Sequence, residues 1–136
     1  MSDLTRSLDI SASGMKAQGT RLRVISENVA NAGSTALSPN EDPYRRKLVT
    51  FGSALDRELG VDLVEVKRVT RDQSDFIQRY EPNHPAADAT GYVRTTNDNT
   101  MIEMADMNDA QRSYEANLKV LQSSRIMLQR TIELLR

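Results

Sequence analysis

Apolar residues near the start of the chain recur every seven positions, the spacing of a helix that buries one stripe of its surface. The series consists of Met1, Leu8, Met15, Leu22 and Val29, with Leu4, Ile25 and Ala32 three residues after its members. This pattern predicts a helix from Leu4 to Ala32. Gly33 is the expected stop, because glycine readily adopts the left-handed conformation that ends many helices.

A second apolar series with heptad spacing occupies the C-terminal part of the chain. It consists of Met107, Tyr114, Leu121, Leu128 and Leu135, and Leu118, Val120, Met127, Ile132 and Leu134 widen the stripe. Thr100 and Glu103 have the spacing of a capping box, so this helix is predicted to run from Thr100 to Arg136. Early acidic residues suit the positive end of a helix dipole, and we expect Glu103, Asp106 and Asp109 to lie on one solvated face.

The segment between the two predicted helices has a different texture. It holds all four prolines of the chain, together with short runs rich in valine, threonine and tyrosine. Such runs, separated by proline and glycine, are typical of strands and loops. We expect strands at Tyr44–Phe51, Gly60–Thr70 and Phe76–Tyr80, a helical turn at Ser53–Leu59, and an irregular connection at Glu81–Gly91.

These elements predict a mainly α protein with a small β-rich middle. The long N- and C-terminal helices are expected to pair as an antiparallel, coiled-coil-like core, with the β segment inserted between them. The expected domains are an inner helical domain, residues 1–33 together with 97–136, and an outer β-rich or loop region, residues 34–96.

Neither helix can bury its apolar stripe alone, and the wider C-terminal stripe exceeds what one partner helix covers. We therefore expect one set of residues to pack within the helix pair or between subunits. The set is Leu4, Leu8, Met15, Leu22, Ile25, Val29, Met107, Tyr114, Leu118, Leu121, Leu128, Ile132 and Leu135.

Composition and charge narrow the classes of function. The chain has 136 residues, of which 38% are hydrophobic and only 4% aromatic, so its core is expected to be aliphatic and thin. Its 18 basic and 19 acidic residues give a formal charge of −1, so no field of one sign attracts nucleic acid or an anionic membrane. The absence of cysteine excludes disulfides, thiolate metal sites and cysteine nucleophiles.

No targeting or membrane segment is recognisable in the sequence. The first residues lack the basic and apolar regions of a cleavable signal peptide. No apolar stretch approaches the roughly 18 residues that span a bilayer. We expect a protein that is not inserted in a membrane and that, if exported, keeps its N-terminus.

The sequence contains few candidate catalytic or metal-binding residues. His84 is the only histidine, and its position between Pro82 and Pro85 predicts an exposed loop residue. A metal site would need further ligands, and no recognised nucleophile or phosphate-binding motif occurs. A small hydrolase would have to rest on His84 or on a pair of carboxylates. We therefore expect no enzyme activity, no cofactor and no small-molecule substrate.

Motifs at both ends of the chain carry a family resemblance. Ile10–Met15 is followed by Ser26–Ala32, which contains Asn-Val-Ala-Asn, and the C-terminal helix contains Arg-Ser-Tyr-Glu-Ala-Asn at Arg112–Asn117. Together these resemble the terminal signatures of the flagellar axial proteins, the rod and hook components. The signature residues at the two ends are Asn28, Asn31, Tyr114 and Asn117.

The middle segment resembles the proximal-rod branch of that family. The resemblance lies in Tyr80–Val93, preceded by Pro43–Lys47. The signature residues there are Tyr80, Pro82, Pro85, Asp88, Gly91 and Tyr92. After Asn31 the chain reads Ala-Gly-Ser-Thr where many axial relatives have Thr-Gly-Tyr, which argues against a distal-rod or hook member.

The resemblance implies a structural role in the flagellar basal body. Such subunits are exported unfolded by the flagellar type III apparatus, join a hollow helical tube in the periplasm with other rod proteins and further copies of themselves, and transmit motor torque. A cytosolic coiled-coil adaptor or chaperone is the alternative. It would explain the paired helices but not the strand-rich middle, and it predicts a folded dimer in dilute solution.

Overall fold

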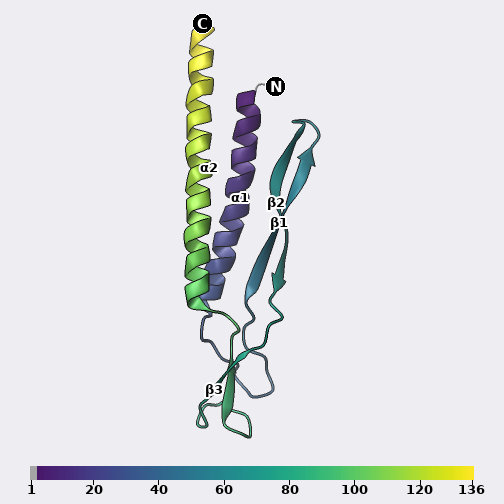
Figure 1. Cartoon of the computed structure of the whole chain (residues 1–136), viewed down its shortest axis with the longest axis vertical. Helices are drawn as coiled ribbons and strands as arrows, with labels where there is room; N and C mark the ends of the chain where they lie inside the picture. Colours follow the sequence, from purple (N-terminus) through teal and green to yellow (C-terminus); the bar gives the residue numbers. More distant parts are fainter. Residues whose placement is uncertain (1–2) are drawn as a thin grey trace. The chain divides into compact units, whose positions relative to one another are not determined.

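The computed structural model describes residues 3–136, and its helices and strands follow the predicted order (Figure 1). The elements are α1 (Asp3–Ala30), β1 (Lys47–Asp56), β2 (Val61–Arg71), β3 (Ile77–Tyr80), β4 (Tyr92–Thr95) and α2 (Thr100–Leu134). Two long helices with small β-sheets between them in sequence confirm the predicted fold class. Met1, a member of the N-terminal apolar series, lies with Ser2 outside the described residues.

The chain forms two compact units, each of which draws on both helices and on part of the β segment. Unit 1 comprises the chain up to Arg23 together with Val49–Arg68 and Asn108–Arg136, and unit 2 comprises Val24–Leu48 and Val69–Met107. The division into residues 1–33, 34–96 and 97–136 stays a prediction.

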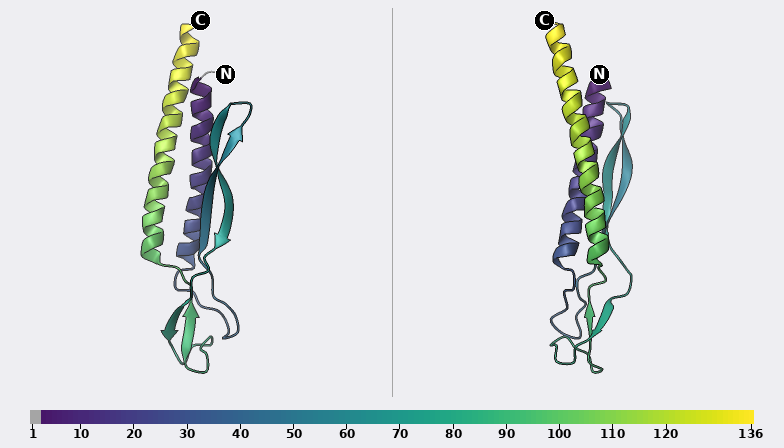
Figure 2. Two further views of the ribbon diagram at one scale, coloured as in Figure 1. Left: turned by 45° about the vertical axis from the view of Figure 1, so that its right-hand side comes forward. Right: turned by 60° about the vertical axis from the view of Figure 1, so that its left-hand side comes forward.

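In unit 1, α1 and α2 pack side by side and run antiparallel (Figure 1). The Ser7 and Ser124 hydroxyl oxygens are 3.2 Å apart, and seven residues further along α1 Gly14 faces Asn117, seven residues earlier on α2. Strands β1 and β2 pair as a hairpin that lies beside α1 in both views of Figure 2. The Val64 amide donates to the Ser13 hydroxyl at 3.3 Å, so the hairpin contacts the same helix through hydrogen bonding.

The end of α1 confirms the predicted stop. The Asn31 amide donates to the carbonyls of Glu27 and Asn28, and Gly33 then adopts a φ of +73°. A left-handed residue after the last helical turn is the arrangement that glycine favours.

Three predicted strands are confirmed as β1, β2 and β3, with shifted ends. The predicted helical turn at Ser53–Leu59 is wrong, because β1 continues through Asp56. The Asp56 carboxylate accepts hydrogen bonds from the amides of Glu58 and Leu59, and the Gly60 amide donates to the Asp56 carbonyl at 2.8 Å. These bonds close the reversal of the backbone between β1 and β2, which starts only after Asp56.

Unit 2 contains the second small sheet and a strand that was not predicted. Strand β4 pairs antiparallel with β3, with Ile77 opposite Thr95 and Tyr80 opposite Tyr92. The Tyr80 and Tyr92 rings meet edge to face with centroids 5.3 Å apart. Val93 is fully buried in this unit, and much of the rest of the unit's core is polar.

The start of α2 corrects the predicted cap. The Asn99 side-chain oxygen accepts hydrogen bonds from the amides of Met101 and Ile102 at 3.0 and 3.4 Å, so Asn99 is the N-cap. The Glu103 side chain does not complete a capping box with Thr100, because it is hydrogen bonded within the core of unit 2. No described helix is both long and apolar enough to cross a membrane.

Candidate functional site

In unit 1 the two helices meet through small side chains. We call the Ser7–Ser124 and Gly14–Asn117 contacts the helix seam, and we group with them the buried small residues Ser11 and Ala17 of α1 and Ala110 of α2. A Cβ atom added to Gly14 would lie 2.8 Å from the Asn117 side-chain nitrogen. The helices therefore approach closely at this point, and a larger side chain at Gly14 would require a neighbour to move.

The residues predicted to pack differ in how exposed they are. Ile25 is buried. The half-buried members are Leu4, Leu8, Met15, Leu22, Val29, Met107, Tyr114, Leu118, Leu121 and Leu128. Ile132 and Leu135 are exposed, at 51% and 83%. Their assignment to contacts between subunits stays a prediction.

The last turns of α2 carry apolar side chains that the chain itself leaves open. The register of the helix pair places Asp3 opposite Leu128, so the described part of α1 does not extend beside the turns that follow. The exposed large apolar residues of α2 in unit 1 are Val120, Ile126, Met127, Ile132 and Leu134, and Leu135, directly after the helix, is also exposed. We call Ile132, Leu134 and Leu135 the C-terminal apolar patch.

Unit 1 also has an open groove between α1 and the β1–β2 hairpin. Its volume is about 490 Å³, and it is lined by Ser13, Lys16, Ala17 and Thr20 of α1 and by Ala54, Leu63, Val64, Glu65 and Val66 of the hairpin. The groove carries no cluster of catalytic side chains, so its chemistry is that of a packing surface.

Unit 2 is organised around Asn28, the first asparagine of the N-terminal signature. The Asn28 side-chain amide donates to the Lys47 carbonyl at 2.9 Å and to Glu103 Oε2 at 3.2 Å. Its side-chain oxygen accepts from the Tyr44 hydroxyl at 2.8 Å and from the Lys47 amide at 2.9 Å. A fully buried asparagine with four hydrogen bonds thus connects α1, β1 and α2.

Arg46 gathers carboxylates around the same point. Its Nε donates to Glu103, Nη2 contacts Asp106 at 3.3 Å, and Nη1 lies 3.8 Å from Asp72. Burial alone would lower the pKa of Arg46, but the hydrogen bond and negative charge of Glu103 outweigh it and raise that pKa. The predicted solvated face is wrong for Glu103, which is only 1% exposed and serves as the acceptor at the centre of this cluster.

Asp98 is the second buried carboxyl group of unit 2. It precedes the α2 cap, and neither of its carboxylate oxygens meets a donor in hydrogen-bonding geometry. Burial, followed by the charge and hydrogen bond of Glu103, raises the pKa of Asp98 to about 6. Burial and the nearby Glu27 likewise raise the pKa of the Tyr44 hydroxyl.

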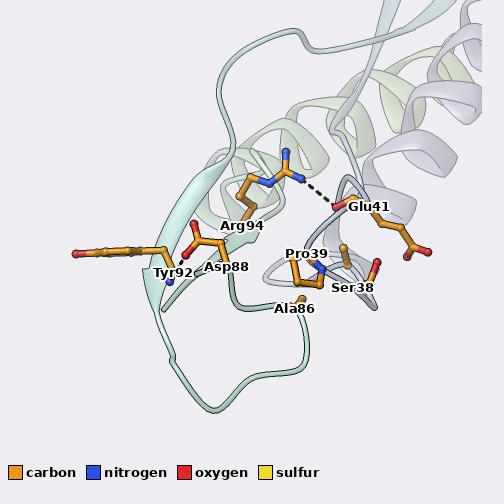
Figure 3. A pocket seen from close by; sticks show the side chains of 8 residues that line it. Ser38, Pro39, Glu41, Ala86, Asp88, Tyr92 and Arg94 are labelled. Carbon is orange, nitrogen blue, oxygen red and sulfur yellow. Dashed lines mark hydrogen bonds between the residues drawn. The ribbon is translucent and has the colours of Figure 1, made fainter. Parts of the chain in front are cut away.

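The middle signature residues shape a turn and leave no room for a ligand. Asp88 Oδ1 accepts from the amides of Thr90 and Tyr92 at 2.8 and 3.0 Å, and hydrogen bonds with the Thr90 side chain and these amides lower the pKa of Asp88. A Cβ on Gly91 would lie 2.8 Å from the Tyr80 ring. The hollow in Figure 3, between Asp88 and Pro39, holds about 20 Å³, the space of one water molecule.

The remaining signature residues have local roles or are exposed. The Asn31 side chain donates to the Glu27 carbonyl at 2.8 Å, which fixes the end of α1. Pro82 and Pro85 are exposed, and Tyr114 is half-buried on α2. The signature thus falls on the helix ends, the helix seam and one turn, which are structural positions.

His84 corrects a second expectation, because it is half-buried and hydrogen bonded. Its Nδ1 accepts from the Ala86 amide at 3.0 Å, and Nε2 lies 3.3 Å from the Thr35 hydroxyl. Both contacts fix the loop. Among residues 3–136, no group of three or more histidine, aspartate and glutamate side chains is arranged to hold a metal ion.

Several residues of the helix seam and of the network around Asn28 share a heptad spacing that a search for apolar residues does not detect. Ser7, Gly14 and Asn28 share one heptad series on α1, and Glu103, Ala110, Asn117 and Ser124 share another on α2. Residues seven positions apart lie on one face of a helix, so these series group residues that contact the partner helix, although the α1 series also contains Arg21.

Comparison with known proteins identifies the class of protein to which the chain belongs. Residues 8–36 match the family model "Flagella basal body rod protein", and residues 89–134 match "Flagellar basal body rod FlgEFG protein C-terminal". Both models describe rod proteins of the bacterial flagellum, and the matched segments contain most of α1 and all of α2.

Relatives that match over nearly their whole length identify the family more specifically. The chain is 51% identical over 136 residues to the flagellar basal-body rod protein FlgC of Agrobacterium fabrum, covering 100% of this chain and 98% of the relative. It is 37% identical to FlgC of Bacillus subtilis, with 94% and 95% of the two chains covered, and 38% identical to FlgC of Salmonella typhimurium, with 93% of each covered. The chain belongs to the FlgC family of flagellar basal-body rod proteins. It is a structural component of the basal body, not an enzyme.

Proposed function

We propose that the chain is a subunit of the proximal rod and that the C-terminal apolar patch packs against neighbouring subunits. The observation that carries the proposal is the exposure of Ile132, Leu134 and Leu135 beyond the described start of α1. Burying one such aliphatic side chain contributes about 1.5–3 kcal/mol, so contact with a neighbouring helix would stabilise assembly. The assembled subunits form a hollow helical tube that transmits motor torque.

The half-buried apolar residues beside the helix seam extend this contact. Residues such as Leu8, Met15 and Leu121 are partly covered by the helix pair and keep surface available for another copy or another rod protein. The terminal helices, residues 1–33 and 97–136, then form the inner part of the tube, and residues 34–96 form its outer part.

Delivery to the rod uses the flagellar type III export apparatus, without a cleaved signal peptide. Two properties of the chain support this. It has no cysteine, so passage as an unfolded chain neither breaks nor requires a disulfide. The helix seam is built from small side chains, which bury little apolar area and leave the helices of unit 1 dependent on neighbours.

The test places charge in the C-terminal apolar patch. Ile132→Asp combined with Leu135→Asp should leave export and the fold of unit 2 unchanged, because both side chains are exposed in the single chain. Each buried charge would cost several kcal/mol in an assembled subunit. We expect exported protein, no completed rod or hook, and no swimming, measured by fractionation, electron microscopy of basal bodies and soft-agar motility.

The control places the same two charges earlier on the same helix, away from the C-terminal apolar patch. Gln111→Asp combined with Gln122→Asp changes two exposed polar residues of α2 and should preserve swimming. Normal swimming in the Ile132/Leu135 variant would contradict the interface. Retention of that variant in the cytoplasm, with the control exported, would contradict the separation of export from assembly.

A further inference from the structure

Unit 2 buries a carboxyl group that has no hydrogen-bond donor. Asp98 is only 6% exposed, and both of its side-chain oxygens lack a donor in hydrogen-bonding geometry. An ionised carboxylate that has lost its hydration is unfavourable unless protein donors replace the water. The position instead suits a carboxyl group that carries a proton, because the neutral acid requires less compensation.

The nearby cations are already engaged. Arg46 donates to Glu103 and contacts Asp106 and Asp72, while Lys47 Nζ pairs with Glu27 at 2.7 Å. Arg71 lies over the Tyr44 ring, with its guanidinium carbon 6.0 Å from the ring centroid. One guanidinium thus contacts the carboxylates of Asp72, Glu103 and Asp106, and Asp98 adds a further acidic group that acts on its pKa. This excess of negative charge favours proton uptake.

Glu103 can accept that proton. Each of its carboxylate oxygens already accepts one hydrogen bond, Oε2 from Asn28 and Oε1 from Arg46, and each has a second lone pair. The Asp98 and Glu103 side chains are both buried in unit 2 at the start of α2, and Glu103 is the neighbouring group that raises the pKa of Asp98 most after burial itself. We propose that Asp98 keeps a proton in the folded chain and donates it to Glu103, forming a buried carboxyl pair that closes unit 2 at the start of α2.

The proton makes the stability of unit 2 depend on pH. Burial, followed by Glu103, raises the pKa of Asp98 to about 6 from an unfolded value of 3.8. The folded state therefore binds more protons than the unfolded state between these values. The stabilisation is fully present below 3.8 and is lost as the pH rises through 6, so unit 2 is more stable at pH 5 than at pH 7.5.

The experiment titrates Asp98 directly in the full chain. In a carbon-detected NMR titration, the side-chain carboxyl carbon of Asp98 should respond with a midpoint of about 6. A midpoint near the ordinary aspartate value of about 3.9, in a chain whose Val93 amide remains protected from exchange, would overturn the proposal. A response of this carbon to added Mg²⁺ or Ca²⁺ that replaces the proton titration would also overturn it.

A variant tests the consequence for stability. The equilibrium for opening of unit 2, from hydrogen exchange of the Val93 and Thr96 amides, should be about tenfold larger at pH 7.5 than at pH 5 in the unmodified chain. Asp98→Asn, which mimics the protonated acid in shape, should remove most of this dependence. Asp75→Asn, at an exposed carboxylate of the same unit, should retain it. An unchanged dependence in Asp98→Asn would overturn the proposal, and if that variant does not fold, the titration of the unmodified chain still decides.

Discussion

In unit 1 the two helices meet through serine, glycine and alanine, whereas in unit 2 the same two helices meet through Asn28, Arg46 and Glu103. Small side chains allow a close approach but bury little apolar area, and the large aliphatic residues of unit 1 remain half-buried or exposed. In unit 2 the polar network satisfies most of its own donors and acceptors.

The two units therefore differ in what their side chains stabilise. A network of directional hydrogen bonds accepts few alternative arrangements, so it defines how the ends of the helices join the β segment. An apolar surface that the chain covers incompletely gains stability when another subunit buries it. A component of an assembly is expected to expose such a surface.

Among the substitutions considered, Asn28→Ala should cause the largest loss of stability. The substitution would remove the partner that Asn28 provides to the Tyr44 hydroxyl, to the Lys47 backbone amide and carbonyl, and to Glu103 Oε2. We expect unit 2 to lose about 2–4 kcal/mol of stability, because unsatisfied buried polar groups are costly. Hydrogen exchange of the Val93 and Thr96 amides measures this loss.

Asn31→Ala is the matched control for that measurement. Asn31 belongs to the same signature but makes one local bond to the Glu27 carbonyl, so the expected loss is about 1 kcal/mol or less. Equal losses for the two variants would show that the network around Asn28 has no special weight in unit 2.

The helices and their pairing follow from the apolar series, but the line of closest contact does not. Large residues such as Leu8 and Leu121 stand out in a search for apolar repeats, whereas Gly14 and Asn117 lie at the contact itself. How close two helices come depends on the smallest side chains between them, which an apolar pattern does not record.

The polar core of unit 2 was hidden for a different reason. Glu103 occupies the first turn of α2, where an acidic residue is already explained by the helix dipole, so nothing local in the sequence indicated burial. Its partners Asn28 and Arg46 are distant in sequence, and only folding brings them together. Strand β4 was missed similarly, because its four residues gain strand structure by pairing with β3.

A smaller change in stability is expected from alanine substitutions at two glycines of α1. At Gly19 an added Cβ meets no atom within 4 Å, so Gly19→Ala should stabilise unit 1 by about 0.5–1 kcal/mol through helix propensity. At Gly14 the same methyl would lie 2.8 Å from Asn117, so the gain should be reduced or reversed. Denaturant unfolding followed by circular dichroism measures both.

Asn117→Ala provides the check on that interpretation. Combined with Gly14→Ala, it removes the side chain that the added methyl meets and should recover most of the difference from Gly19→Ala. Equal stabilisation by Gly14→Ala and Gly19→Ala in the otherwise unmodified chain would mean that the helices are not closely packed at this point.

The smallest effect is expected at His84, the one residue whose side-chain type invites a chemical role. His84→Ala removes the acceptor for the Ala86 amide and the contact with Thr35, both at the half-buried edge of unit 2. We expect a loss of about 0.5 kcal/mol in that unit and none in unit 1, because a net hydrogen bond contributes at least about this much and both contacts are only half-buried. Swimming in soft agar should be unchanged, since the contacts of His84 fix a loop and form no reactive cluster. His84→Asn, which keeps a side-chain acceptor, should recover part of the stability. If His84→Ala abolished swimming while exported protein and the exchange of unit 2 stayed normal, the residue would have a role that its loop contacts do not provide.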